Sequence, residues 1–238
     1  MRDGASNIIG WIKNSFIDFP GTVSTVLFFS GCNLRCPYCH NPGIVLNASP
    51  EEIPFEHIRA FLEKRKGMIE GVVLSGGEPT IHPGLLDIVK DIRALGYLIK
   101  LDTNGLRPGV IRAVAPDYLA LDVKTLPGNY TALLKSPYAD SPERLASSIE
   151  IARLMGDNAE VRITAAPGII DRTVITELAA LLKGVRNVFV QPMQTRAELL
   201  DPAMRERGPV LLSELTAYRE ILLKHVDRCE IRGDGGGR

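Results

Sequence analysis

Short apolar runs alternate with amphipathic segments along most of the chain. Six of these runs are rich in Val, Ile and Leu at consecutive positions, as strands covered on both faces are. They predict strands at Ser24–Phe29, Gly71–Leu74, Leu98–Asp102, Tyr118–Asp122, Glu160–Ala165 and Val185–Gln191, after a hairpin strand at Ile8–Lys13. The pattern therefore predicts a sheet whose strands are mostly buried.

Between these runs, apolar positions recur at helical spacing. Pro83–Leu95 is the clearest case, because Pro83 suits a first helical turn and Gly96 suits a C-terminal stop. Three further helices are expected to begin at residues suited to N-caps, which are Ser141, Asp171 and Ser213. The remaining predicted helices are Pro54–Lys66, Pro108–Val114 and Asn129–Lys135.

A strand followed by a helix, repeated about six times, predicts a parallel sheet with right-handed crossovers. A closed eight-fold barrel takes ~250 residues. The 238 residues fit better as an incomplete (β/α)6 barrel of the TIM type, open at the C-terminal strand ends. A flat, doubly wound sheet is the alternative. No linker is visible, so we expect one domain over 1–238, with an N-terminal extension (1–22), the partial barrel (23–195), and a C-terminal helix with a flexible tail (196–238).

A polar cluster follows each predicted strand. The carboxyl ends of parallel strands share one rim, which is where ligands bind in parallel α/β folds, so we expect these clusters to meet there. In chain order the clusters are the Cys32–Cys39 loop, Ser75–Glu78, Asp102–Gly105, Asp122–Lys124, Arg162 with Thr164, and Gln191–Gln194.

The composition narrows the classes of partner. Lys plus Arg and Asp plus Glu both total 28, so the formal net charge is zero, and bulk electrostatics predict no nucleic-acid partner and no membrane partner. No signal peptide and no run of eighteen apolar residues is visible, which predicts a cytoplasmic location. In that compartment, clustered cysteines indicate metal binding or catalysis and not disulfides.

Three of the four cysteines, Cys32, Cys36 and Cys39, lie within eight positions. A zinc site with His40 as the fourth ligand would place adjacent ligands in a single loop, whereas structural zinc sites usually pair two distant ligand loops. A c-type haem site, which the C-x-x-C-H pattern also allows, and a redox dithiol would both leave Cys32 without a role.

A [4Fe–4S] cluster held by three thiolates is the fourth interpretation. Such clusters normally have four cysteine ligands. Three ligands would leave one iron open to chelate a substrate, much as a catalytic zinc site keeps one position open. Cys229 is the only other cysteine of the sequence, so we expect no auxiliary cluster.

The segment Gly31–Asn41 resembles the signature of the radical S-adenosylmethionine (radical SAM) superfamily, Cys-x3-Cys-x-aromatic-Cys, with Tyr38 as the aromatic residue. The His-Asn pair after the motif and the segment Ser15–Gly21 resemble the glycyl-radical-enzyme activating enzymes. Within that group the chain is similar to the activating proteins of anaerobic ribonucleoside-triphosphate reductase, with those of pyruvate formate-lyase as near relatives. The resemblance covers about residues 8 to 195.

The resemblance implies an oxidoreductase with two cofactors, a [4Fe–4S] cluster and S-adenosyl-L-methionine. It implies that one electron, from a donor such as flavodoxin or ferredoxin, cleaves S-adenosylmethionine to a 5′-deoxyadenosyl radical, which makes a glycyl radical on a partner enzyme. The implied partner is anaerobic ribonucleoside-triphosphate reductase. The alternatives are a pyruvate formate-lyase type of glycyl radical enzyme, a peptide, a small molecule or, without catalysis, a zinc-binding interaction module.

The resemblance also implies roles for residues of the rim. In the superfamily a glycine-rich strand end, here Gly76-Gly77-Glu78, binds the methionyl amino group, and Lys124 meets the cofactor carboxylate. Gln194 departs from the pattern, because pyruvate formate-lyase activating enzyme has a histidine there and a glutamine cannot titrate. A monovalent cation site is implied at Asp102, Thr103 and Asp122. The other implied cofactor contacts are Tyr38, His40, Asn104, Asp122 and Arg162.

The same residues also have readings that need no cofactor. The glycines fit a strand-to-helix turn, and Asp102 and Asn104 fit turn formation and capping. Asp122 and Lys124 fit a surface ion pair worth at most ~1 kcal/mol.

Overall fold

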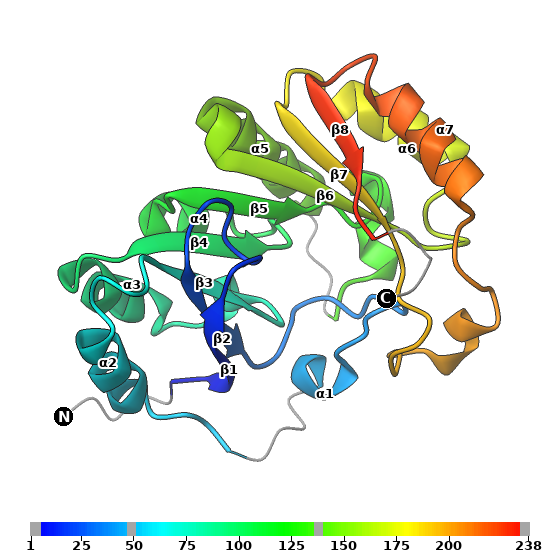
Figure 1. Ribbon diagram of the computed structural model, residues 1–238. Helices are drawn as coiled ribbons and strands as arrows, with labels where there is room; N and C mark the ends of the chain where they lie inside the picture. The colour runs from blue at the N-terminus through cyan, green and yellow to red at the C-terminus, as the bar shows by residue number, and fades with distance from the viewer. Residues whose placement is uncertain (1–5, 47–50, 136–139, 234–238) are drawn as a thin grey trace. The chain divides into compact units, whose positions relative to one another are not determined.

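The computed structural model describes residues 6–46, 51–135 and 140–233 (Figure 1). The strands are β1 (Ile8–Ser15), β2 (Ser24–Phe29), β3 (Gly71–Gly76), β4 (Leu98–Thr103), β5 (Tyr118–Asp122), β6 (Ala159–Ala165), β7 (Asn187–Pro192) and β8 (Arg228–Ile231). The α-helices are α1 (Pro42–Val45), α2 (Phe55–Lys64), α3 (Leu85–Ala94), α4 (Pro108–Val114), α5 (Ser141–Met155), α6 (Arg172–Leu181) and α7 (Leu212–Leu222). Short 3₁₀ helices are η1 (Pro79–Ile81), η2 (Pro127–Ala132), η3 (Gly156–Asn158) and η4 (Pro202–Arg205).

The chain forms two compact units, each built from several stretches of sequence. Unit 1 comprises the described parts of Met1–Asn33, Gly43–Thr103 and Gly109–Leu119. Unit 2 comprises the described parts of Leu34–Pro42, Asn104–Pro108 and Ala120–Arg238.

Unit 1 is built on the first four strands. β1 pairs with β2 in antiparallel fashion, and β2, β3 and β4 pair in parallel, with Leu27 opposite Leu74 and Leu74 opposite Leu101. These three leucines are fully buried, as expected for strands that are covered on both faces. Helices α2 and α3 contact each other, and α3 also packs against β4.

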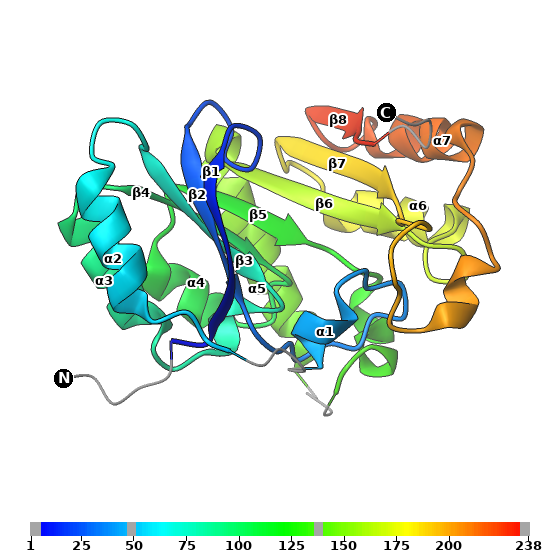
Figure 2. The same ribbon diagram turned by 60° about the horizontal axis from the view of Figure 1, so that its bottom comes forward.

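Unit 2 is built on the last three strands. β6, β7 and β8 pair in parallel, and Figures 1 and 2 show them side by side with α6 and α7 lying along β7 and β8. The side chains alternate between the two faces of β6. Val161 and Ile163 are fully buried, whereas Arg162 and Thr164 are partly exposed. One face of this sheet is therefore apolar, and the other carries polar side chains.

The predicted fold class is confirmed, because the strands form a mostly parallel, open sheet with helices between them. The hydrogen-bonded order of the strands is the chain order, β1 to β8. Each predicted strand is present, and β2 and β5 have the predicted bounds. No helix within the described ranges is long and apolar enough to cross a membrane.

Several local predictions were wrong. Ser141 is the first residue of α5, after Asp140 at the N-cap, and Ser213 lies inside α7, which follows Leu211. The helix predicted at Asn129–Lys135 is the 3₁₀ helix η2, which begins at Pro127. Strand β8 was missed in the C-terminal part, where only a helix was expected. The tail 234–238 lies outside the described residues.

Candidate functional site

The glycine-rich end of β3 packs against the residue that precedes the cysteine motif. Gly77 N donates to Phe29 O at 2.8 Å, and Glu78 N donates to Gly31 O at 2.9 Å. A Cβ atom at Gly77 would lie 1.8 Å from Gly31 O, and one at Gly76 would lie 2.4 Å from Phe29 N. Gly76 also has a φ of +111°, which side chains rarely tolerate. Both glycines are therefore required by the close approach of two backbones.

Glu78 orders this loop from the inside. Its side chain is buried, with 1% of the residue exposed. Its Oε1 accepts hydrogen bonds from Thr80 N at 3.1 Å and from Thr103 Oγ1 at 2.7 Å, and the Thr80 hydroxyl donates to the same atom. These bonds cap η1 and tie it to the end of β4. They give Glu78 and Thr103 a structural role in addition to the predicted contacts with a cofactor and a cation.

Asp102 lies on β4 in unit 1, and Asn104 follows β4 and belongs to unit 2. Each has hydrogen-bond partners in the unit to which it belongs. Asp102 Oδ2 accepts from Ser75 Oγ at 3.0 Å, and its Oδ1 lies 2.7 Å from the ammonium of Lys100, a side chain with 4% exposure. Asn104 Oδ1 accepts from Leu106 N at 3.2 Å, which closes a turn. Lys100 thus supplies positive charge to Asp102, and the monovalent cation stays a prediction.

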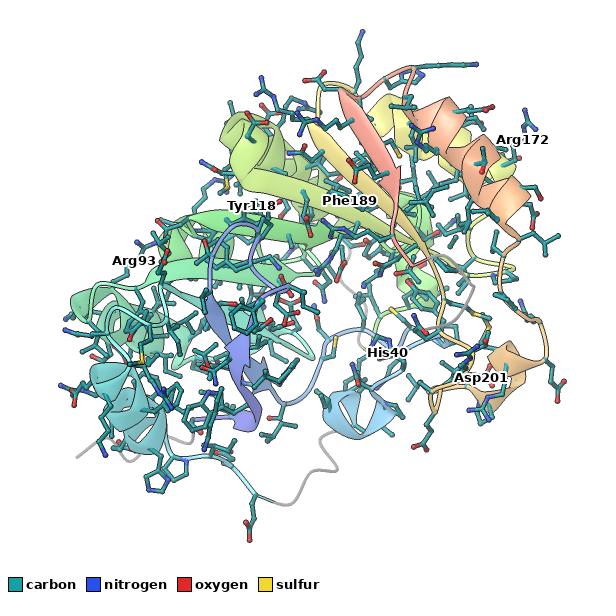
Figure 3. All side chains as sticks on the ribbon, in the orientation of Figure 1. His40, Arg93, Tyr118, Arg172, Phe189 and Asp201 are labelled. Carbon is teal, nitrogen blue, oxygen red and sulfur yellow. The ribbon has the colours of Figure 1, made fainter. Side chains whose placement is uncertain are left out.

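Main-chain hydrogen bonds of unit 2 hold the part of the cysteine loop that carries Cys36 and Cys39. Arg35 N donates to Leu133 O at 2.6 Å. Leu200 N donates to Cys39 O and Asp201 N to Pro37 O, both at 2.9 Å. Figure 3 labels His40 in this loop and Asp201 in the segment that holds it. A loop fixed in this way can bind a metal group without a further loss of conformational entropy.

The two cysteines of this loop differ in environment. Cys36 is buried, and this burial raises the pKa of its thiol, although the ammonium of Lys124 nearby acts in the opposite direction. Cys39 is half-buried. Cys32 in unit 1 is also half-buried and donates to Asn33 Oδ1 at 3.9 Å. All three are reduced thiols, so each is chemically ready to become a thiolate ligand.

Tyr38 and His40 flank Cys39. Tyr38 is buried, and its hydroxyl lies beside the thiol of Cys36. Burial and the nearby Cys36 raise the pKa of Tyr38 well above its usual range, so the hydroxyl keeps its proton. Burial and the ammonium of Lys124 lower the pKa of His40, so its imidazole is neutral at pH 7. Both side chains can therefore donate or accept hydrogen bonds without carrying charge.

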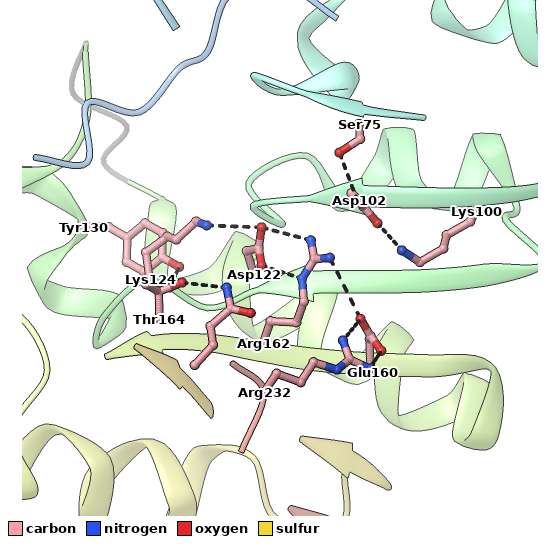
Figure 4. A network of polar contacts seen from close by, with 11 residues as sticks. Ser75, Lys100, Asp102, Asp122, Lys124, Tyr130, Glu160, Arg162, Thr164 and Arg232 are labelled. Carbon is pink, nitrogen blue, oxygen red and sulfur yellow. Dashed lines mark hydrogen bonds and ion pairs between the residues drawn. The ribbon is translucent and has the colours of Figure 1, made fainter. Parts of the chain in front are cut away.

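Asp122, Lys124 and Arg162 form a compact ionic group in unit 2, which Figure 4 shows in close view. Arg162 Nε donates to Asp122 Oδ1 at 2.8 Å, and Nη2 donates to Oδ2 at 3.1 Å. Lys124 Nζ lies 3.1 Å from the same Oδ2. This is a two-pronged guanidinium–carboxylate pair with a second cation on one oxygen, a geometry that fixes all three side chains.

The charges of this group stabilise one another. Burial acts to raise the pKa of Asp122, but Arg162 and Lys124 hold it well below its usual range. Burial acts to lower the pKa of Lys124, but Asp122 and Cys36 raise it. Lys124 is therefore an ammonium at neutral pH, and with two cations for one carboxylate the group has an excess of positive charge.

The remaining residues of the predicted polar clusters lie on the polar sheet face or at the surface. Thr164 and Gln191 are opposite each other on β6 and β7, and Gln191 Nε2 donates to Thr164 Oγ1 at 3.2 Å. Gln194 is exposed. Tyr130, which the sequence analysis did not single out, is fully buried, and its hydroxyl accepts from Lys124 N at 2.9 Å.

The donor set fits a [4Fe–4S] cluster. In the described ranges, no group of three or more His, Cys, Asp or Glu could hold a single metal ion. A cluster makes a different demand, because each thiolate binds its own iron and the ligands need not converge on one point. Cys32, Cys36 and Cys39 are free thiols within eight positions and would supply the three thiolates.

Comparison with known families decides the class of protein. The model of the radical SAM superfamily matches residues 26–181. The chain belongs to the radical SAM superfamily. That superfamily implies a [4Fe–4S] cluster and S-adenosylmethionine, so both predicted cofactors are confirmed, as is the prediction of a radical SAM enzyme. The roles of individual residues stay predictions.

The relatives of this radical SAM protein include activating enzymes. It is 26% identical over 249 residues to a candidate glycyl-radical enzyme activating enzyme of Methanocaldococcus jannaschii. That alignment covers 96% of this chain and 97% of the relative. It is 30% identical over 180 residues to the pyruvate formate-lyase-activating enzyme of Clostridium pasteurianum, with 72% and 74% covered. It is also 27% identical over 232 residues to 7-carboxy-7-deazaguanine synthase of Rhodopirellula baltica, with 93% and 82% covered.

Solved structures show the same fold. SuiB of Streptococcus suis, bound to its precursor peptide SuiA, aligns with a TM-score of 0.65 at 16% identity over 87% of this radical SAM protein and 48% of SuiB. The chain thus spans about half the length of SuiB. TYW1 with a lysine–pyruvate adduct aligns with a TM-score of 0.60 at 16% identity, over 87% of this chain and 76% of TYW1. These alignments support the open α/β fold and carry no information on the substrate.

Proposed function

We propose that this radical SAM enzyme generates a glycyl radical on a partner enzyme, and that the partner is anaerobic ribonucleoside-triphosphate reductase. The observation that carries the proposal is the match along nearly the whole of both chains to the candidate activating enzyme of M. jannaschii. The shorter match to a pyruvate formate-lyase-activating enzyme supports the same class. The partner itself rests on the resemblance of the cysteine motif, with His40 and Asn41 after it, to the reductase-activating proteins.

Cys32, Cys36 and Cys39 would hold the [4Fe–4S] cluster. When bound, the cluster and S-adenosylmethionine together supply the one-electron reductive cleavage of a carbon–sulfur bond, with flavodoxin or ferredoxin as the proposed electron donor. The protein contributes binding, orientation and the exclusion of water. We also propose that the chain acts as a single radical SAM domain, because the matched range 26–181 draws on residues of both units.

Two groups of residues bind and orient the cofactor. Lys124 keeps its proton and offers a cation to a carboxylate, and Asp122 and Arg162 hold its ammonium in place. A charge-assisted hydrogen bond of this kind contributes roughly 1.5–3 kcal/mol. Gly76 and Gly77 let the end of β3 pack against Phe29 and Gly31, and a backbone carbonyl at this strand end would accept a hydrogen bond from the ammonium group of the cofactor.

A small-molecule substrate is the second candidate. The 7-carboxy-7-deazaguanine synthase of R. baltica matches 93% of this chain, and its name describes an enzyme that makes a small molecule. A zinc-binding interaction module receives no support, because the chain belongs to the radical SAM superfamily.

Radical transfer tests the proposal. The reconstituted enzyme is mixed anaerobically with S-adenosylmethionine, dithionite and, in separate samples, anaerobic ribonucleoside-triphosphate reductase or pyruvate formate-lyase. We expect a glycyl radical signal in the electron paramagnetic resonance spectrum of the first sample, and none when Cys36→Ala replaces the wild type. A signal only with pyruvate formate-lyase would overturn the partner. The absence of a signal with both, while 5′-deoxyadenosine is formed, would overturn the activating function.

A further inference from the structure

The ionic group of unit 2 continues beyond Arg162 to two residues that the cofactor contacts do not include. Figure 4 shows charged side chains of alternating sign, from Lys124 through Asp122, Arg162 and Glu160 to Arg232. Arg162 Nη1 lies 3.9 Å from Glu160 Oε1. Arg232 Nη1 donates to Glu160 Oε1 at 2.8 Å, and Nη2 donates to Oε2 at 2.7 Å.

Glu160 is a buried carboxylate at the start of β6. Its side chain is 2% exposed, so an ionised carboxylate there must be paired. The two parallel bonds from Arg232 supply that pairing and fix the plane of the carboxylate. One oxygen of this carboxylate then faces the guanidinium of Arg162.

Arg232 is itself held on two sides. Its guanidinium carbon lies 3.3 Å from the ring centroid of Phe189, a stacked cation–π contact. Its main-chain N–H donates to Val190 O at 2.9 Å, which continues the parallel ladder of β7 and β8 by one residue. Arg219 of α7 donates to Cys229 O at 2.9 Å and fixes the strand from the helix side. Arg232, which directly follows β8, therefore holds its guanidinium in a fixed position beside Glu160.

Arg162 shares its guanidinium between two carboxylates. Its Nε and Nη2 bind Asp122, and its Nη1 lies on the Glu160 side. A guanidinium is planar, so fixing Nη1 also fixes the two nitrogens that bind Asp122. The orientation of Asp122 then determines where the ammonium of Lys124 lies, because both cations use Asp122 Oδ2.

We propose that Glu160 and Arg232 are positioning residues that hold Arg162, and through it Asp122 and Lys124, in the arrangement that binds S-adenosylmethionine. This inference rests on the proposed cofactor-binding role of Lys124. It gives strand β8 a part in the site, although none of its residues belongs to the predicted cofactor contacts.

Equilibrium binding separates this role from simple support of the fold. The dissociation constant of S-adenosylmethionine is measured by anaerobic calorimetry on reconstituted enzyme, without partner or reductant. Iron and sulfide content and the melting temperature are measured on the same samples. The variants are Arg232→Met, Glu160→Gln and Arg232→Lys. The control is Arg228→Met, which changes an exposed arginine on β8, the strand that Arg232 directly follows.

We expect Arg232→Met and Glu160→Gln to raise the dissociation constant about tenfold, the size of effect typical of residues that orient a ligand-binding group. Iron and sulfide content stay at the wild-type level. Arg232→Lys gives an intermediate value, because a lysine keeps the charge but cannot donate two parallel bonds. Arg228→Met binds as the wild type does.

A double-mutant cycle tests whether Arg232 acts through Arg162. If it does, adding Arg232→Met to Arg162→Met changes the dissociation constant no further, whereas independent roles would give additive effects. Additivity would overturn the proposal. So would wild-type affinity in an Arg232→Met protein whose melting temperature alone has fallen. Since no partner is present, failure of radical transfer to the reductase leaves this result unaffected.

Discussion

At the scale of single residues, Gly77 leaves no room for a side chain. A Cβ atom there would meet Gly31 O at 1.8 Å. Gly77→Ala must push two strand ends apart, and we expect a loss of about 1–3 kcal/mol in the free energy of unfolding, as overpacking typically causes. Gly84 is the matched control, because a Cβ atom there meets nothing within 4 Å. Urea denaturation of both variants makes the comparison, and equal losses would contradict the tight contact.

Cys229 gives a prediction about pH. Burial raises the pKa of its thiol to about 12, so the folded protein keeps a proton that the unfolded chain releases above about pH 9. A raised pKa stabilises the fold at lower pH, and this contribution is lost as the pH rises. Between pH 8 and 10 the wild type should lose roughly 1 kcal/mol more than Cys229→Ala does. Free energies of unfolding under reducing conditions check this, and parallel pH profiles would rule it out.

Sequence alone could predict the superfamily, because the spacing of Cys32, Cys36 and Cys39 resembles the radical SAM signature. It also held a signal that the prediction did not use. Lys100 and Glu160 are charged residues inside strands predicted to be buried, and a buried charge implies a partner. Arg232 carries no such signal, because its partner Glu160 lies 72 positions away and is reached only through the strand pairing.

At the scale of elements, helix starts show why some predictions failed. Asp171 was correctly predicted, since its Oδ1 accepts from Val174 N at 2.8 Å at the start of α6. Ser213 has the same preference for N-caps but lies one residue inside α7, where Leu211 occupies the cap position. Propensity identifies the kind of residue, whereas the packing of the helix decides where its first turn begins.

These two helices provide a paired test. Asp171→Ala removes a capping bond and should lower the free energy of unfolding by about 1 kcal/mol. Ser213→Ala removes no cap, and its effect should stay within about 0.5 kcal/mol. Thermal and urea unfolding of both variants give the two values. If Ser213→Ala proved as damaging as Asp171→Ala, the assignment of the caps would be wrong.

At the scale of the whole molecule, the alternation of strands and helices was enough to predict the fold class. The six predicted strands that follow the hairpin strand are present, because each contains an apolar run of strand length. Strand β8 could not be predicted, because Arg228–Ile231 is short and half polar, and only its pairing with β7 makes it a strand. The division into two compact units was not visible either, since each unit combines distant stretches of sequence.

Production of 5′-deoxyadenosine is the most direct measurement of the central claim, that Cys32, Cys36 and Cys39 hold the cluster at which S-adenosylmethionine is cleaved. The protein is reconstituted anaerobically with iron and sulfide, and the product is quantified after S-adenosylmethionine and dithionite are added. The wild type and Cys229→Ala should both form 5′-deoxyadenosine, and Cys36→Ala should form none, because it lacks one thiolate ligand. Equal product from Cys36→Ala and the wild type would contradict the account.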